Sequence, residues 1–248
     1  MLPPAASTMT DSKPCAVVTG AARGIGRAIA AKLLADGYRV ILSDVAQETL
    51  RETTLELGAS DAVAFTADVT SAADCARLAE FAEAAGGIGL WINNAGLARH
   101  RRVVDYTEAE IDLMLSVNLK GAILGSQAAL RTMAPKRAGH IINIISTAAL
   151  RGIPSETVYC AAKWGVRGFT QGLREEAAAV GVRVSALLPG GVDTGFWNDA
   201  VSRTMPTADF LTATQVADAV SALARMEASV VPQELVLRAL KDRDFAHV

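Results

Sequence analysis

The sequence contains little cysteine and no long apolar run, and each absence excludes a class of protein. Its three cysteines, Cys15, Cys75 and Cys160, are odd in number and lie in apolar or helical contexts. This pattern is typical of reduced thiols, so it argues against a disulfide framework and predicts a cytoplasmic protein. No stretch reaches the roughly 18 consecutive apolar residues that a membrane-spanning helix requires. We therefore expect no membrane partner.

The chain also lacks an excess of charge of either sign. Its 24 basic and 26 acidic residues are spread along the sequence and give a net charge of −2. Nothing in this distribution favours nucleic acid or an anionic membrane as a partner. There are no repeats, low-complexity segments or visible linkers, and 51% of the residues are apolar. We therefore expect one domain with a substantial core over residues 14–248. Residues 1–13 lack the apolar segment of a secretory signal and are predicted to form a disordered tail.

The stretch from Cys15 to Asp44 organises the rest of the chain. An apolar run at 15–19 is followed by a turn with three glycines at 20–26, and then by apolar residues at helical spacing up to Asp36. Gly37 ends the helix, and a second apolar run at 40–43 leads to Asp44. The order predicts a strand, a helix over 27–36 and a second strand parallel to the first.

The glycine turn and Asp44 together suggest a dinucleotide site. A glycine turn at the start of a helix offers backbone N–H groups and the positive end of the helix dipole, so a pyrophosphate fits there. Asp44 lies 18 residues after Gly26 and ends a strand, where it can accept hydrogen bonds from an adenosine ribose. In the alternative interpretation, the glycines serve only the turn and close packing.

Asp44 favours NAD over NADP. A carboxylate that binds the ribose 2′-hydroxyl would repel a 2′-phosphate. Arg23, in the glycine turn, argues in the other direction because it could pair with a phosphate. The residues after Asp44, however, are Val45 and Ala46, and neither is basic.

The remaining chain alternates between strand and helix patterns, which predicts a doubly wound parallel α/β sheet of about seven strands. We expect further strands at 62–67, 89–93, 140–145, 181–188 and 234–238. Helices are expected at 47–57, 72–85, 107–133, 157–179 and 212–226. Thr107 and Glu110 form a capping-box pattern at the start of the third of these helices.

Polar residues stand at several predicted strand ends, where parallel sheets bind cofactors. Asp68 follows one strand, although it could instead cap the helix that begins near Ser71. The run 93–96, Asn-Asn-Ala-Gly, and Ser146 follow two others. The 93–96 run suits close cofactor approach, or it is an ordinary turn. Asn118 lies inside a predicted helix, where asparagine is unfavourable unless it is exposed or has a function.

Tyr159 and Lys163 lie four residues apart on the predicted helix 157–179. They therefore share one face of that helix and are separated by about 6 Å along its axis. Taken alone, they could be an ordinary surface pair. In that position a lysine could also stabilise a tyrosinate.

These motifs occur in the order and spacing of a known family. The chain resembles the short-chain dehydrogenase/reductase family in its single-domain form, from Cys15 to about Arg238, and Ser146 lies 13 residues before Tyr159. The resemblance rests on eight motifs, which are Thr19 to Gly26, Asp44, Asp68, Asn93 to Gly96, Asn118, Ser146, Tyr159 with Lys163, and Pro189 to Thr194.

The resemblance implies an NAD(P)-dependent alcohol dehydrogenase or ketoreductase that acts on a small-molecule alcohol or ketone. Tyr159 would be the general acid and base, Lys163 its electrostatic partner and a ligand of the nicotinamide ribose, and Ser146 the holder of the substrate oxygen. Asn118 would position a water that links Lys163 to solvent. The cofactor would be held by Gly20, Arg23, Gly24, Ile25, Gly26, Asp44, Asp68, Val69, Asn94, Ala95, Gly96, Tyr159, Lys163, Pro189, Gly190, Val192 and Thr194.

Tyrosine can act as a base near neutral pH only if its pKa falls. The ordinary pKa is near 10, and lowering it by about three units requires roughly 4 kcal/mol of preferential stabilisation of the phenolate. The Lys163 ammonium and the positive charge of an oxidised nicotinamide are suitable sources. We therefore expect a lowered pKa at Tyr159.

Substrate is expected to enter between the loops that follow Gly96, Ser146 and Pro189. A substrate loop at about 190–212 contains Phe196, Trp197, Met205 and Phe210, which could form an apolar pocket wall or anchor an amphipathic helix. The basic run 99–102 and Arg151 could bind an acidic substrate group, or the run could be a solvated loop.

Two rival functions and an assembly state complete the expectations. A non-catalytic nucleotide-sensing regulator could lose its tyrosine or lysine, yet both are present here. Epimerases and dehydratases that use bound NAD usually have a longer C-terminal substrate domain. The helices that carry Asn118 and Tyr159 are rich in alanine and leucine. By analogy with the family they predict a homo-oligomer, either a dimer or a tetramer.

Overall fold

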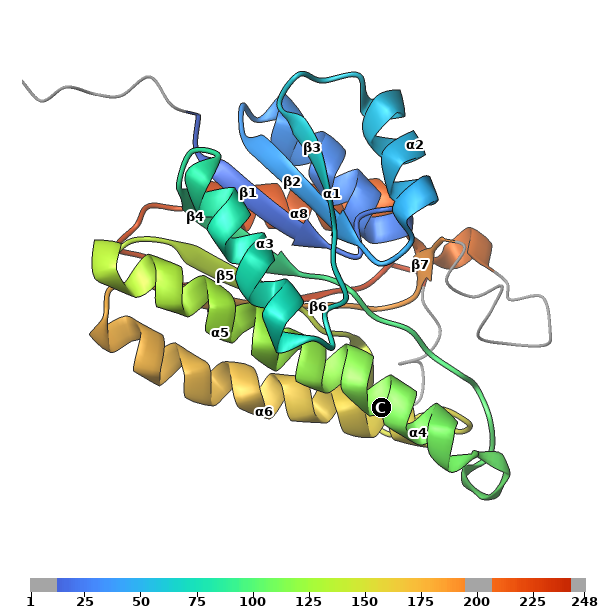
Figure 1. Ribbon diagram of the computed structural model, residues 1–248. Coiled ribbons are helices and arrows are strands. Elements are labelled where there is room, and N and C mark those ends of the chain that lie inside the picture. The colour runs from blue at the N-terminus through green and yellow to red at the C-terminus, as the bar shows by residue number, and fades with distance from the viewer. Residues whose placement is uncertain (1–12, 195–206, 242–248) are drawn as a thin grey trace, which may run out of the picture.

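A computed structural model describes residues 13–194 and 207–241 of the chain. Within these residues the centre is a seven-stranded sheet in the order β3-β2-β1-β4-β5-β6-β9, and every neighbouring pair is parallel (Figure 1). The strands are β1 (Cys15–Thr19), β2 (Arg39–Asp44), β3 (Ala62–Thr66), β4 (Ile88–Asn93), β5 (His140–Ile144), β6 (Arg183–Pro189) and β9 (Glu234–Leu237). The predicted parallel α/β sheet is confirmed.

Helices cover both faces of this sheet (Figure 1). One face carries α1 (Gly24–Ala35), α2 (Gln47–Leu57) and α8 (Ala213–Arg225), and the other carries α3 (Ala72–Ala84), α5 (Gly121–Met133) and α6 (Thr157–Ala179). Successive residues of β1 alternate between the two cores: Ala16 and Val18 face the α1 side, and Cys15 and Val17 face the α3 side. Both faces are buried, which explains why the strands are nearly continuous apolar runs in the sequence.

The strand order reverses between β1 and β4, and this reversal sets the position of the site. The chain proceeds from β1 outward to β2 and β3, and then returns to the other side of β1 for β4, β5 and β6. In open parallel sheets the crevice at such a reversal, outside the carboxyl ends of the strands, binds ligands. The glycine turn after β1 and the 93–96 run after β4 both lie at this edge.

Most predicted helices match the structure closely. The bounds of α2 and α6 are as predicted, and α3 and α8 differ at their ends by one residue. The prediction was wrong at the start of α1, which begins at Gly24 and not at Arg27. The last residues of the glycine turn already belong to the helix, and Gly24, its first residue, has a left-handed φ of +57° that glycine adopts without strain.

The predicted helix 107–133 is divided by an irregular turn. It consists of α4 (Glu108–Leu115), a π-helical turn at Ser116–Lys120 and α5. The capping box is confirmed, because the Thr107 hydroxyl accepts a hydrogen bond from the Glu110 N–H at 3.2 Å and the Glu110 carboxylate accepts one from the Thr107 N–H at 3.1 Å. Asn118 lies in the π turn and is 2% exposed, so the interpretation of a surface asparagine is wrong.

By length and composition alone, the helical stretch Glu108–Lys136 could cross a membrane. Its second half has the contacts of a core helix, since Ala129 and Met133 are fully buried against the sheet. The expectation that the protein has no membrane partner therefore remains a prediction.

A buried polar network lies between the sheet and α5. Trp91 in β4 is fully buried, and its indole N–H donates to Asn93 Oδ1 at 2.8 Å. The Asn93 amide donates in turn to the Ser126 hydroxyl and to Asn143 Oδ1, both at 2.8 Å. A Cβ added to Gly125 would lie 2.2 Å from Asn93 Oδ1, so α5 needs glycine at this position.

A second, two-stranded sheet escaped sequence analysis because its strands are only two residues long. β7 (Val192–Asp193) pairs in parallel with β8 (Leu211–Thr212). The two strands flank residues 195–206, so Phe196, Trp197 and Met205 of the predicted substrate loop lie outside the described residues, as does the predicted tail apart from Lys13.

Candidate active site

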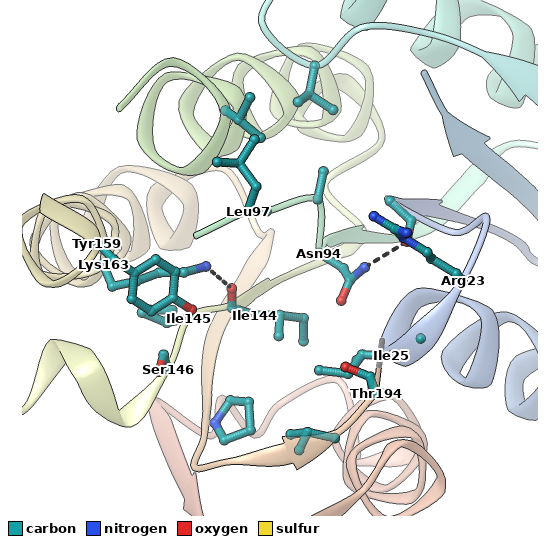
Figure 2. A pocket seen from close by; sticks show the side chains of 18 of the residues that line it. Arg23, Ile25, Asn94, Leu97, Ile144, Ile145, Ser146, Tyr159, Lys163 and Thr194 are labelled. Carbon is teal, nitrogen blue, oxygen red and sulfur yellow. Dashed lines mark hydrogen bonds between the residues drawn. The ribbon is translucent and has the colours of Figure 1, made fainter. Parts of the chain in front are cut away.

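A cavity of about 540 Å³ opens at the carboxyl ends of the strands and contains nearly all of the predicted site residues. Of these residues, Gly26 and Asn118 alone do not line it. Figure 2 shows Arg23, Asn94 and Thr194 around one end of the cavity and Ser146, Tyr159 and Lys163 around the other. The fold therefore places the predicted cofactor residues and the predicted reacting residues in one space.

The glycines of the turn after β1 serve two different purposes. Gly20 (φ +65°) and Gly24 (φ +57°) line the cavity. A Cβ on Gly26 would lie 2.1 Å from the Gly20 carbonyl oxygen and 2.6 Å from the Asn94 amide nitrogen. Gly26 therefore lets α1 pack closely against the turn, as the packing interpretation predicted. Gly20 also packs closely, because a Cβ there would lie 2.7 Å from the Ala95 Cα, whereas a Cβ on Gly24 would come no closer than 3.5 Å to Thr194 and leaves room beside the cavity.

Asn94 ties the end of β4 to this turn. Its amide nitrogen donates to the carbonyl oxygens of Thr19 at 2.9 Å and Gly20 at 3.1 Å. The Thr19 hydroxyl accepts from the backbone N–H groups of Asn94 at 3.0 Å and Ala95 at 3.2 Å. The 93–96 run is thus part of a cross-sheet hydrogen-bond network and not an isolated turn.

The two predicted acids at strand ends also support the backbone around the cavity. Asp44 accepts from the Ala22 N–H at 3.1 Å and from the Ala46 N–H at 3.0 Å. Asp68 accepts from the backbone N–H and the hydroxyl of Thr70, each at 2.8 Å. The cap of α3 is Ser71, whose hydroxyl accepts from the Asp74 N–H, so Asp68 is not the helix cap.

Tyr159, Lys163 and Ser146 meet at the other end of the cavity (Figure 2). Lys163 is 5% exposed, its Nζ donates to the Ile144 carbonyl at 3.3 Å, and it lies 5.6 Å from the centre of the Tyr159 ring. The Ser146 hydroxyl is hydrogen-bonded to Tyr159 and also accepts from the Ala148 N–H at 3.0 Å. The interpretation of Tyr159 and Lys163 as a surface pair is therefore wrong.

Burial changes the proton affinities of both helix residues. It raises the pKa of Tyr159 above its ordinary value, the nearby Glu156 carboxylate raises the pKa further, and the hydrogen bond to Ser146 opposes the shift. Burial lowers the pKa of Lys163 to about 8. The expected lowering of the Tyr159 pKa by Lys163 is not found, because removal of the phenolate from water is the largest cause of the shift and Lys163 is not among the causes. The further lowering expected from an oxidised nicotinamide stays a prediction.

Asn118 acts on the cavity wall indirectly. Its amide nitrogen donates to the carbonyl oxygens of Leu97 at 2.8 Å and Met114 at 2.9 Å, and its carbonyl oxygen accepts from the Leu97 N–H at 3.2 Å. Asn118 thus fixes Leu97, which lines the cavity. Its expected role in holding a water beside Lys163 stays a prediction.

The cavity lining also includes residues that sequence analysis missed. Four of them are apolar: Leu97, Leu113, Val117 and Ile153. The same space contains the missed residue Glu156. A pattern in the sequence could have indicated Glu156, because it precedes Tyr159 by three residues and so shares its helix face.

The basic run 99–102 contributes only its histidine to the described cavity lining. Arg101 pairs with Glu110 at 2.8 Å and Arg102 with Asp105 at 2.9 Å. These two arginines therefore fit the solvated-loop interpretation, and Arg151 does not contribute to the described lining either.

Comparison with known proteins agrees with this geometry. The family model described as short chain dehydrogenase matches residues 14–204. An uncharacterised oxidoreductase of Staphylococcus aureus is 39% identical over 189 residues, covering 76% of this chain and 81% of the relative. L-2,3-butanediol dehydrogenase of Corynebacterium glutamicum is 40% identical over 188 residues, covering 73% of each chain.

Solved structures show the same similarity over a larger part of the chain. The alcohol dehydrogenase of the archaeon Thermococcus sibiricus, in complex with 5-hydroxy-NADP, superposes with a TM-score of 0.84 at 29% identity. The alignment covers 92% of this chain and 97% of that one. With a family match over most of its length and a site of this geometry, the chain belongs to the short-chain dehydrogenase family of oxidoreductases.

Proposed function

We propose that this protein is an NAD-dependent alcohol dehydrogenase or ketoreductase that acts on the CH–OH group of a small molecule in the cytoplasm. The observation that carries the proposal is the meeting of Ser146, Tyr159 and Lys163 in the cavity that the glycine turn also lines. Carbonyl reduction requires a proton donor, a cation and a hydroxyl next to the coenzyme, and these three groups lie in the same cavity as the glycine turn.

The described residues fit a nicotinamide coenzyme. Gly24 lines the cavity at the first turn of α1, and a Cβ there would come no closer than 3.5 Å to Thr194, so the bare glycine backbone leaves space for a ligand. Backbone N–H groups of that turn would hold the pyrophosphate, Asp44 the adenosine ribose and Lys163 the nicotinamide ribose. Asp68, Val69 and Thr194 would line the rest of the coenzyme. When bound, the coenzyme supplies or accepts the hydride.

Tyr159 would transfer the proton. In carbonyl reduction its hydroxyl protonates the developing alkoxide, and in alcohol oxidation its phenolate removes the hydroxyl proton. Ser146 would hold the same oxygen, since its hydroxyl is already hydrogen-bonded to Tyr159. Lys163 would stabilise the phenolate, and its charge acts strongly because the site is buried.

The preference for NAD rests on Asp44, which lines the cavity at the end of β2. The carboxylate would repel a 2′-phosphate. The Thermococcus relative was crystallised with 5-hydroxy-NADP, so the coenzyme preference of this chain has to be measured. Steady-state kinetics with both coenzymes should give a larger kcat/KM with NAD.

The proposed chemistry is tested with Tyr159→Phe. A panel of secondary alcohols and ketones, followed at the absorbance of reduced nicotinamide, first identifies the best substrate. General acid–base groups typically contribute about 10²- to 10⁴-fold, so the variant should lose activity by that factor while it still binds NAD. Turnover by the variant at the parent rate would contradict the mechanism. Coenzyme binding without turnover in the parent protein would favour a nucleotide-sensing regulator.

A homo-oligomer is part of the proposal. In a single chain, only 39% of the most apolar 18-residue part of the helical stretch Glu108–Lys136 is buried. Trp164 on α6 is 49% exposed. Apolar surface of this kind on adjacent helices would be covered by a second copy of the chain.

A further inference from the structure

The cavity contains a histidine–carboxylate contact that the proposed proton transfer does not use. The imidazole Nε2 of His100 lies 3.5 Å from Glu156 Oε1, and their side chains are 10% and 11% exposed. Both residues line the cavity, as do the apolar residues Leu113 and Ile153. A carboxylate in such surroundings interacts more strongly with a ligand than one in water does.

Backbone contacts hold the two loops that carry this pair together. The Arg101 N–H donates to the Ser155 carbonyl at 2.9 Å. The Tyr106 hydroxyl lies 2.5 Å from the Arg99 carbonyl oxygen and 3.3 Å from that of Ser155. Ser155 also has a φ of +64°, a left-handed conformation that L-residues adopt where the surrounding structure enforces it, often at functional sites. The His100–Glu156 pair is therefore held in place from both sides.

Glu156 is close to the proposed proton donor. It lies at the N-cap position of α6, one helical turn before Tyr159, and its negative charge is felt by the phenol. The positive end of the helix dipole favours the ionised carboxylate at this position. Side chains three residues apart on a helix have Cβ atoms about 5–6 Å apart. A small molecule that reacts at Tyr159 can therefore reach Glu156 with a group one or two carbons away.

We propose, on the basis of the function proposed above, that Glu156 accepts a hydrogen bond from a second donor group on the substrate, a hydroxyl or an ammonium group, with His100 positioning the carboxylate. The preferred substrates are then alcohols with such a group one or two carbons from the reacting carbon. An anionic group at the same position is repelled by Glu156. Glu156 determines specificity, and His100 is a positioning residue.

Four matched secondary alcohols test this assignment: propan-2-ol, propane-1,2-diol, 1-aminopropan-2-ol and 2-hydroxypropanoate. The kcat/KM of the parent protein should be highest for the diol or the amino alcohol and lowest for the acid. A hydrogen bond to a charged group should favour the better donor substrate over propan-2-ol by roughly ten- to a hundredfold. Preference for the diol identifies a hydroxyl as the group bound, and preference for the amino alcohol identifies an ammonium group.

The variants Glu156→Gln and His100→Asn should reduce that ratio, and Glu156→Gln should remove the discrimination against the acid. Glu110→Gln is the matched control, because Glu110 lies on the same side of the protein, pairs with Arg101 and does not line the cavity. The control should keep the parent ratio. The affinity for NAD, measured by fluorescence titration, should be the same in all four proteins.

The outcomes separate this inference from the proposed function. Turnover of the four alcohols with the same ratios in Glu156→Gln and the parent protein would overturn the role of Glu156 and leave the dehydrogenase proposal standing. No turnover of any alcohol or ketone with either coenzyme would overturn the dehydrogenase proposal itself.

Discussion

At the scale of single residues, the site is governed by charges removed from water. Tyr159 and Lys163 lie side by side, and burial disfavours the charged form of each: it raises the pKa of the phenol and lowers that of the ammonium to about 8. The attraction between them has to overcome this cost. Asp44 lies at a more open position and is held by two backbone N–H groups.

Asp44→Asn should weaken coenzyme discrimination. Asparagine keeps an acceptor oxygen for the Ala22 N–H and removes the negative charge. Since about 1.4 kcal/mol corresponds to a tenfold change, the loss of even a modest repulsion should lower the ratio of kcat/KM with NAD to that with NADP by about tenfold. Glu48→Gln, on the exposed face of α2, is the charge-matched control. An unchanged ratio in Asp44→Asn would show that Asp44 does not select the coenzyme.

His140 should make the protein sensitive to acid. Burial lowers its pKa from 6.5 to about 3, and its Nδ1 is buried with no hydrogen-bond partner in the part of the chain that the structure describes. The unfolded chain therefore takes up a proton first as the pH falls. The stability due to neutral His140 is fully present above about pH 6.5 and is lost progressively toward pH 3.

His140→Gln tests this linkage. Between pH 7 and pH 5 the parent protein should lose roughly 2 kcal/mol more of its free energy of unfolding than the variant, at about 1.4 kcal/mol per pH unit below 6.5. Urea denaturation at the two pH values measures the difference. Equal losses in both proteins would exclude His140 as the source.

At the scale of secondary-structure elements, the close packing of two elements limits which residues can occupy the contact between them. The contact of α5 with β4 requires Gly125 beside Asn93, and the π turn between α4 and α5 brings Asn118 to Leu97. Irregular π turns often occur at functional sites. Here the turn converts a helix-interior asparagine into a support for the cavity wall.

Gly125→Ala should destabilise the protein. The added methyl group would lie 2.2 Å from Asn93 Oδ1 and disturb the hydrogen bonds of the buried network, and overpacking of this kind costs about 1–3 kcal/mol. Gly152→Ala is the control, because an added Cβ there meets nothing within 4 Å. Chemical denaturation should show a lower free energy of unfolding for the first variant and no loss for the second. Equal stabilities would mean that α5 shifts at little cost.

At the scale of the whole molecule, the exposed Trp164 of α6 and the partly buried apolar residues of the neighbouring α5 predict self-association. Trp164→Glu should place a charge among these residues and reduce the molar mass, measured by light scattering after size exclusion, toward the 25.9 kDa of one chain. Leu55→Glu, at an exposed position on α2, is the control and should leave the assembly intact. A parent protein that elutes as a monomer would contradict the prediction.

Much of the fold could be predicted from the sequence, because the patterns that indicate it involve residues that are close together in the chain. The apolar runs of a doubly covered sheet, the glycine turn and the capping box at Thr107 each depend on residues within one turn or one strand. The short pair β7–β8 and the start of α1 were missed, since two-residue strands have no periodicity and helix ends are poorly marked.

The order of strands and helices, the polar residues at the strand ends and, through eight spaced motifs, the family could all be predicted from the amino-acid sequence. The burial of Asn118, the raised pKa of Tyr159 and the contact of His100 with Glu156 became apparent in the folded chain alone. The difference lies in the distance along the chain over which each interaction acts. Periodicity and turn chemistry act between near neighbours in the chain, whereas desolvation and the meeting of side chains from separate loops depend on how the whole chain packs.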